Sequence, residues 1–338
     1  MTKENELYVP EGYRSALSLR ETQHAIKFIK DVFQQALSFA VTLDRVTAPL
    51  IVRSGSGIND DLNGVERKVR FDMLLSDGEA EVVQSLAKWK RMALYQYGYR
   101  EGEGIYTDMN AIRRDDKMDN VHSIFVDQWD WEKVITREQR NTEFLKETVK
   151  SIVKAIVFTK RQVTLRYSML DAPVSDEVYF ITTQELLERY PDRTPRERER
   201  LIAQEKKTVF LMQIGKVLGN GERHDGRAPD YDDWELNGDI IFWDEVLQDS
   251  LEISSMGIRV DEASLASQLK ELNAEDRMQH DYHKMIANGT LPLTIGGGIG
   301  QSRLCMFLLE KAHIGEVQSS VWPKEMAAEC EKNGIQLM

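Results

Sequence analysis

The chain has 338 residues and a mass of 39.0 kDa, which fits one large domain or two small ones. Its 44 Lys and Arg against 56 Asp and Glu give a net charge of −12, so bulk binding of nucleic acid is disfavoured. The first ten residues lack the apolar core of a signal peptide, and the longest uncharged stretch contains Pro292 and five glycines, so no membrane segment is expected. Two cysteines, Cys305 and Cys330, are too few for a disulfide framework and fit a reducing cytoplasm.

The first part of the chain reads as a long helix followed by short strands. Ser18 and Glu21 form a capping-box pattern, and apolar residues follow at helical spacing to residue 40. The β-branched residues of 46–52 predict a strand, and Pro49, which cannot donate to a ladder, places this strand at a sheet edge or a subunit interface. Next we expect a turn-rich loop at 53–64, strands at 69–73 and 81–85, and a helix at 86–97.

The rest of the chain alternates strands and helices. Residues 121–132 are predicted as a strand with Trp129 and Trp131 on its core face. Further helices are expected over 144–156, from residue 195 with Thr194 as its cap, and from residue 261. Strands are expected at 238–243 and 252–260, and a glycine turn at 295–300 is expected to open a buried helix. No repeat or linker is visible, so residues 1–338 are expected to form a single mixed α/β domain built on an antiparallel sheet.

The glycine run before Arg303 has a direct physical use. Gly296 and Gly298 lack Cβ atoms, so a flat ligand could lie on the backbone, and the following helix N-terminus favours anions. Arg303, in the first turn of that helix, could reach a phosphate. A tight strand-to-helix turn with a solvated arginine explains the same residues equally well. The spacing matches neither a dinucleotide-binding fingerprint nor a P-loop, so those families are excluded.

Carboxylates and an amide cluster on other predicted strands. Gln128, Asp130 and Glu132 share one strand face and would suit a pocket that binds an amine and a nucleotide, although the residues alone favour a solvated sheet face. Asp239 and Glu252 lie on neighbouring predicted strands, which suits Mg²⁺ held against a polyphosphate as well as it suits a surface pair. The six histidines show no metal-ligand spacing.

Taken together, these segments resemble a known family. The first helix with the Pro49 segment, residues 104–114 followed by a strand, and the glycine run that opens a helix resemble the three motifs of class II aminoacyl-tRNA synthetases. The longer segments that resemble ammonia-dependent asparagine synthetases are 84–91, 126–132, 227–234, 252–259 and 295–303. The resemblance covers essentially the whole chain.

The resemblance implies a fold and a reaction. The expected fold is α/β (α+β), with a central antiparallel sheet flanked by helices as in class II synthetase catalytic domains, and a homodimer that pairs the first helix and the Pro49 strand. The implied reaction joins L-aspartate and ammonia with ATP and Mg²⁺, through β-aspartyl-AMP, and gives asparagine, AMP and pyrophosphate. Positioning and charge neutralisation carry most of such a transfer.

Roles also carry over residue by residue as expectations from the resemblance. Arg113 and Arg303 are implied to grip the nucleotide from two sides, Gln128 to orient the acyl phosphate, and Asp60 to hold ammonium and accept a proton, with Asp61 as a one-residue alternative. The remaining implied residues are Lys90, Asp130, Asp232 and Ser255 for the substrate, Ser123, Gly296 and Gly298 for the nucleotide, and Asp239 and Glu252 for the metal.

Two other readings compete. A class II synthetase paralogue could transfer an aminoacyl-adenylate to tRNA or to a protein lysine, but the sequence shows no N-terminal β-barrel pattern and no basic stripe. A catalytically silent, ligand-binding paralogue is disfavoured because Arg113, Gln128 and Arg303 are all present. Residue 2 is Thr2 and the cysteines come late, so no glutaminase nucleophile is expected and free ammonia is the implied nitrogen donor.

Overall fold

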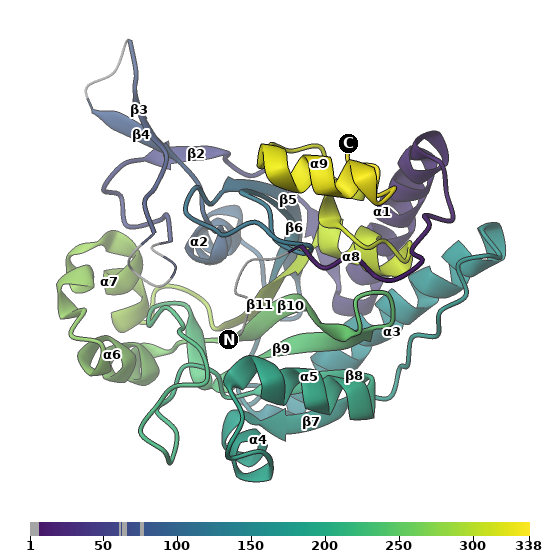
Figure 1. Cartoon of the computed structure of the whole chain (residues 1–338). Helices are drawn as coiled ribbons and strands as arrows, with labels where there is room; N and C mark the ends of the chain where they lie inside the picture. Colours follow the sequence, from purple (N-terminus) through teal and green to yellow (C-terminus); the bar gives the residue numbers. More distant parts are fainter. Residues whose placement is uncertain (1–6, 61, 63–65, 75–77) are drawn as a thin grey trace.

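The computed structural model describes residues 7–60, 62, 66–74 and 78–338 (Figure 1). In this part of the chain the main sheet has eight strands, β1 (Leu43–Arg45), β5 (Gly104–Ile112), β6 (Phe125–Val134), β7 (Tyr179–Thr182), β8 (Thr208–Met212), β9 (Asp232–Asp244), β10 (Asp249–Arg259) and β11 (Thr294–Gly300). Their order is β1-β5-β6-β11-β10-β9-β8-β7. Every interior pair is antiparallel, and only the edge strands β1 and β7 run parallel to their neighbours. The expected central antiparallel sheet flanked by helices is confirmed.

One face of the sheet carries the main hydrophobic core. The helices α1 (Leu19–Val41), α3 (Thr142–Arg166) and α8 (Gln301–Leu308) pack there, with Phe33 and Ile152 fully buried against Trp129 and Trp131. Figure 1 shows α1 and α3 side by side on one side of the molecule. The alternation of residues 128–132 therefore directs the tryptophans into the core, as their period predicts.

The opposite face is covered only in part. Short helices pack over its two ends, α2 (Ala87–Tyr97) near β5 and β6, and α4 (Thr183–Arg189) with α5 (Pro195–Lys206) near β7 to β9. The helices α6 (Glu262–Glu271), η1 (Glu275–Gln279) and α7 (Asp281–Ala287) form a separate apolar cluster with Val260, and η2 (Ile314–Glu316) and α9 (Lys324–Lys332) follow α8. The middle of this sheet face is left for polar residues.

Local sequence signals explain where several helices begin. The Ser18 side chain accepts from the Glu21 backbone N–H, and the Glu21 carboxylate accepts from the Ser18 backbone N–H, so the predicted capping box is confirmed. Thr194 caps α5 in the same way, with Pro195 in its first turn. These caps depend on residues three apart in sequence, which is why the pattern alone locates them.

The prediction of one strand over residues 46–52 is wrong. The chain forms β1 before Pro49 and β2 (Ile51–Arg53) after it, and residues 46–50 belong to neither strand. Proline has no N–H to give to a ladder and therefore interrupts the extended run. The second segment pairs instead with β4 (Glu79–Val82), which also pairs with β3 (Arg70–Asp72), and this small sheet projects from the body in Figure 1.

None of the helices in the described ranges is long and apolar enough to cross a membrane.

Candidate active site

The polar face of the main sheet is built around β6. Gln128, Asp130 and Glu132 alternate with the buried tryptophans and lie on the face opposite the main core. Asp130 and Glu132 are themselves buried, so the solvated-face alternative is wrong for these two residues. Carboxylates are kept out of water only where partners are arranged around them. The face is therefore a built polar site.

The glycine run lies in strand β11, next to β6, and not in a turn as predicted. Gly296 pairs with Glu132 and Gly298 with Asp130, and only Gly300 serves as the N-cap of α8. A Cβ atom at Gly298 would collide with the Gln128 amide, and one at Gly296 would collide with the Glu132 carboxylate. The glycines thus leave space for the polar side chains of β6 that lie over β11, because side chains can approach a strand closely where it has no Cβ atoms.

Strands β10 and β9 continue the same face. Ser255 lies opposite Asp239, and Glu252 lies opposite Ile241. A β-bulge between Glu252 and Ser254 changes the alternation of β10, and it brings the Glu252 and Ser255 side chains onto the face of Asp239. Strict period 2 would have placed positions 252 and 255 on opposite faces, so the bulge is what makes Asp239 and Glu252 neighbours.

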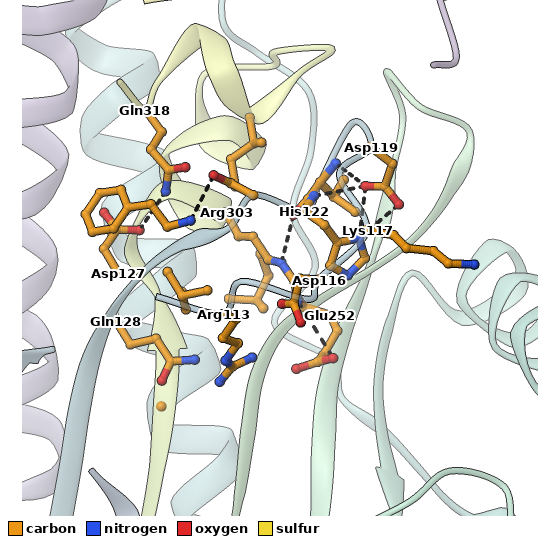
Figure 2. A pocket seen from close by; sticks show the side chains of 18 of the residues that line it. Arg113, Asp116, Lys117, Asp119, His122, Asp127, Gln128, Glu252, Arg303 and Gln318 are labelled. Carbon is orange, nitrogen blue, oxygen red and sulfur yellow. Dashed lines mark hydrogen bonds and ion pairs between the residues drawn. The ribbon is translucent and has the colours of Figure 1, made fainter. Parts of the chain in front are cut away.

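A cavity of about 600 Å³ opens beside this face. Six of the residues predicted from the sequence line it: Arg113, Ser123, Gln128, Glu252, Gly298 and Arg303. Figure 2 shows the Gln128 amide, the Arg113 guanidinium and the Glu252 carboxylate extending toward the lower part of the view. The two arginines come from the end of β5 and from α8, so the fold brings together charges that are 190 positions apart in sequence (303 − 113).

Arg113 and Arg303 are both held by backbone carbonyl groups. Arg113 donates from Nε and an Nη to the Gln84 carbonyl at 3.4 and 3.3 Å. Arg303 donates to the carbonyls of Val121 at 3.3 Å and Glu252 at 3.0 Å, and its guanidinium lies 3.7 Å from the Glu252 carboxylate. Contacts of this kind fix a guanidinium while leaving much of its positive charge for an anion.

A buried ionic network lies beneath the polar face. Lys90 of α2 pairs with Asp130 and donates to the Gly297 carbonyl at 3.1 Å. Asp232 pairs with Arg259, which also binds the Glu132 carboxylate at 3.0 Å. Burial lowers the pKa of Lys90 and raises the pKa of Asp232, and the paired charges oppose both shifts.

Asp60 lies on the loop between β2 and β3, outside the lining of the large cavity. Its side chain is buried, with 1% of the residue exposed, and Oδ2 has no hydrogen-bond partner among the residues that the structure describes. Burial raises the pKa of Asp60 to about 6, Lys88 and Arg113 oppose the shift, and Asp230 adds to it. Asp60 is thus within electrostatic reach of Arg113, which lines the cavity. The alternative residue Asp61 lies outside the described residues.

Asp239 and Glu252 form the candidate metal pair. Asp239 is bound through Oδ2 by Arg227, but Oδ1 is buried and has no hydrogen-bond partner among the described residues. Burial and the charge of Glu252 raise the pKa of Asp239 against the opposing charge of Arg227. Within the described ranges no three His, Cys, Asp or Glu side chains gather as a metal-binding group. Two carboxylates with one free oxygen fit Mg²⁺ when phosphate oxygens complete its shell.

Sequence reasoning missed several members of the site. Arg259 is buried and joins Glu132 to Asp232. The Gln84 amide is also buried, and neither its oxygen nor its nitrogen is hydrogen-bonded to any residue in the described ranges. Arg227, which pairs with Asp239, was present in the sequence analysis only as the first residue of the segment 227–234 that resembles the family. Arg259 could have been predicted as a site residue, because it lies four positions after Ser255 on β10 and residues four apart on a strand share a face. Gln84 offered none.

Comparisons with known proteins agree along the length of the chain. A family model described as aspartate–ammonia ligase matches residues 20–334. A protein named aspartate–ammonia ligase from Clostridium tetani is 57% identical over 334 residues, which is 98% of both chains. One of the same name from Lactobacillus acidophilus is 56% identical over 98% of this chain and all of its own.

Solved structures share the fold at low sequence identity. An Entamoeba histolytica asparaginyl-tRNA synthetase in complex with asparaginyl-adenylate matches with a TM-score of 0.64 and 14% identity, over 89% of this chain and 66% of its own. The asparaginyl-tRNA synthetase from Pyrococcus horikoshii, also complexed with asparaginyl-adenylate, matches with a TM-score of 0.62 and 15% identity, over 90% of this chain and 70% of its own. These matches show a class II synthetase fold.

Proposed function

Because the chain belongs to the aspartate–ammonia ligase family, we propose that the polar face of β6, β11, β10 and β9 and the adjoining cavity are its active site. The protein is a ligase that makes L-asparagine from L-aspartate and ammonia in an ATP-dependent reaction. One observation carries the assignment of the site. Arg113, Gln128 and Arg303, from three distant segments, line the same cavity at the edge of the glycine strand.

In the proposed first step, aspartate is activated by ATP. An oxygen of the aspartate β-carboxylate attacks the α-phosphorus, the new P–O bond forms β-aspartyl-AMP, and pyrophosphate leaves. Arg113 and Arg303 both line the cavity, and in the proposed complex they neutralise the charge that develops on the phosphate oxygens. Gln128 orients the acyl phosphate, and Ser123 lies beside the nucleotide. Gly296 and Gly298 have no side chains, so the nucleotide can approach the strand backbone closely.

The substrate's own charges match the network beneath the face. Aspartate carries one ammonium group and two carboxylates, and Lys90, Asp130 and Asp232 offer the complementary charges. In the proposed complex Lys90 binds a substrate carboxylate, while Asp130 and Asp232 accept from the substrate ammonium group. Arg259 fixes Asp232, and Ser255 adds a hydroxyl on the neighbouring strand. Because the groups are buried and paired beforehand, little reorganisation is needed on binding.

The second proposed step uses Asp60. The nitrogen lone pair of ammonia attacks the β-carbonyl carbon of the adenylate, the bond to the AMP oxygen breaks, and a proton from nitrogen is transferred to the Asp60 carboxylate. The unpartnered Oδ2 of Asp60 supports this role, since an ammonium ion brings N–H donors to it. Asp239 and Glu252 would hold Mg²⁺, which supplies positive charge to the phosphates when it is bound.

A product assay tests this function. The purified protein, incubated with ATP, Mg²⁺, aspartate and ammonium, is expected to give asparagine and AMP in equal amounts. ADP in place of AMP would contradict an adenylate intermediate. Activity with glutamine as the sole nitrogen source would contradict free ammonia as the donor.

Several further features belong to the same proposal. We infer a homodimer, a cytoplasmic location and no nucleic-acid partner, the last supported by the net charge of −12. Transfer of the aminoacyl group to tRNA or to a protein lysine is not favoured, because the relatives that match nearly the full chain carry the ligase name. We also take residues 1–338 as one catalytic domain.

A further inference from the structure

Three donor groups contact a single carboxylate oxygen of Asp230. Its Oδ2 lies 2.9 Å from the Lys88 ammonium, 2.8 Å from the Arg277 guanidinium and 2.9 Å from His283 Nε2, while Oδ1 has no hydrogen-bond partner within the described part of the chain. Asp230 is fully buried, and Lys88 is buried as well. These residues come from the loop before β9, from η1, from α7 and from α2, so Asp230 ties four segments together.

Lys88 connects this cluster to the loop that carries Asp60. Besides Asp230, its ammonium group donates to the Gly57 carbonyl at 3.4 Å, three residues before Asp60. Lys88 makes no ion pair with Asp60, although its charge is the strongest of those that lower the pKa of Asp60. The lysine is therefore close enough to act on Asp60 while it is bound elsewhere.

We propose that Asp230 is a positioning residue for the ammonia step, which holds Lys88 away from Asp60 so that one Asp60 oxygen stays open to ammonium. The inference rests on the proposed role of Asp60. An amine cation fixed on Asp60 would occupy the same carboxylate oxygen that the substrate cation needs, and two cations compete for one acceptor. A bound carboxylate partner prevents this competition, because a buried ammonium group is kept where its charge is compensated.

Removal of the Asp230 charge releases the lysine. In the Asp230→Asn variant Lys88 keeps the Gly57 carbonyl, and Asp60 becomes the carboxylate available to it. The other groups that act on Asp60 are the Leu62 backbone N–H, Arg113 and Tyr231, which stay in place. Arg277 and His283 remain beside position 230. The released lysine then blocks Asp60.

The test is a double-mutant cycle read at the KM for ammonium. We expect Asp230→Asn to raise this KM by about tenfold and to leave aspartate-dependent exchange of pyrophosphate into ATP unchanged. Lys88→Gln alone should not raise the KM, and Lys88→Gln combined with Asp230→Asn should bring it back toward the wild-type value. If Asp230→Asn acted only by damaging the fold, the double variant should have a KM at least as high as that of Asp230→Asn, because two substitutions in one cluster destabilise the fold at least as much as one.

The pH dependence gives a second readout. The acidic midpoint of asparagine formation should shift down by about one pH unit in Asp230→Asn and up by about one in Lys88→Gln, because the first change removes a negative charge near Asp60 and the second a positive one. The matched control is Lys160→Gln on α3, which replaces another buried lysine that pairs with a carboxylate, here the partly buried Glu310; it should change neither the midpoint nor the KM.

The outcomes separate this inference from the proposed function. If the double variant binds ammonium as poorly as Asp230→Asn, the positioning role is wrong, while selective loss of the ammonia step in Asp60→Asn would still support the role of Asp60. If Asp60→Asn impairs exchange as strongly as asparagine formation, the role of Asp60 itself is wrong. Should Asp230→Asn not fold, Asp230→Glu takes its place, with a smaller rise in KM that Lys88→Gln must again reverse.

Discussion

Arg113 combines a planar guanidinium with a fixed position beside the cavity. Replacing it by lysine keeps the charge but loses the forked donors, so Arg113→Lys should reduce asparagine formation by about 100- to 1,000-fold. Arg45→Lys is the control, since Arg45 pairs with Asp108 at an exposed site and should retain activity. Turnover of Arg113→Lys close to that of the wild type would place Arg113 outside the reaction.

Asp60 should matter for one half-reaction only. Asp60→Asn keeps the shape but removes the negative charge and the proton acceptor, so asparagine formation should collapse while aspartate-dependent pyrophosphate exchange survives. Hydroxylamine, which is already neutral at pH 7, should partly restore product formation. Asp244→Asn is the matched control, because burial also raises the pKa of Asp244 to about 6 but the residue lies at the far end of β9.

An equal loss of exchange and product formation would instead assign Asp60 to aspartate binding or to adenylation. If neither activity falls, Asp61 is the residue to test next.

The buried charge of Asp60 should also appear in the stability of the protein. Burial raises its pKa from an ordinary 3.8 to about 6, so the folded state binds the proton more tightly than the unfolded state. The resulting stabilisation is complete below about pH 4 and is lost as the pH rises through about 6. From pH 4 to pH 8, Asp60→Asn should therefore gain about 2 kcal/mol in unfolding free energy relative to the wild type. Denaturant titrations at the two pH values measure the difference, and a constant difference would contradict the buried, ionisable state.

Among the strands, β11 matters because its glycines have no side chains and therefore leave space for Gln128. A methyl group at Gly298 would meet the Gln128 amide, so Gly298→Ala should displace Gln128 and reduce asparagine formation by roughly 100-fold, in line with a single mispositioned group. Gly219→Ala is the control, because its new methyl group would meet only the movable end of Gln184. Equal activity of both variants would show that the close approach of β11 to Gln128 is not needed.

For the whole molecule, the exposed face of α1 and α3 motivates the dimer. An apolar groove of about 620 Å³ lies between the two helices, and Phe39 at its rim is 91% exposed. We expect a solution mass of two chains, about 2 × 39.0 kDa. Phe39→Glu should shift the mass toward one chain, and Val217→Glu, an exposed apolar site after β8, should not. A wild-type monomer with full activity would exclude an obligate dimer.

Much of the local structure could be predicted from the sequence. The caps at Ser18 and Thr194, and the burial of Trp129 and Trp131, follow from residues within four positions of each other, and such patterns act wherever the segment lies. The cavity residues Arg113, Gln128 and Arg303 were found through long motifs that resemble a family.

Only the tertiary structure decided how these parts meet. The glycine run is a strand and not a turn because β6 and β10 pair with both of its sides, and neither partner is near it in sequence. The bulge in β10 brings Glu252 beside Asp239, and Arg259 becomes a buried link because Glu132 and Asp232 arrive from other strands. The sequence by itself determined which residues are polar, apolar or without a side chain. Which of them share a site depends on long-range pairing, and hydrogen bonds between distant strands leave no short-range pattern in the chain.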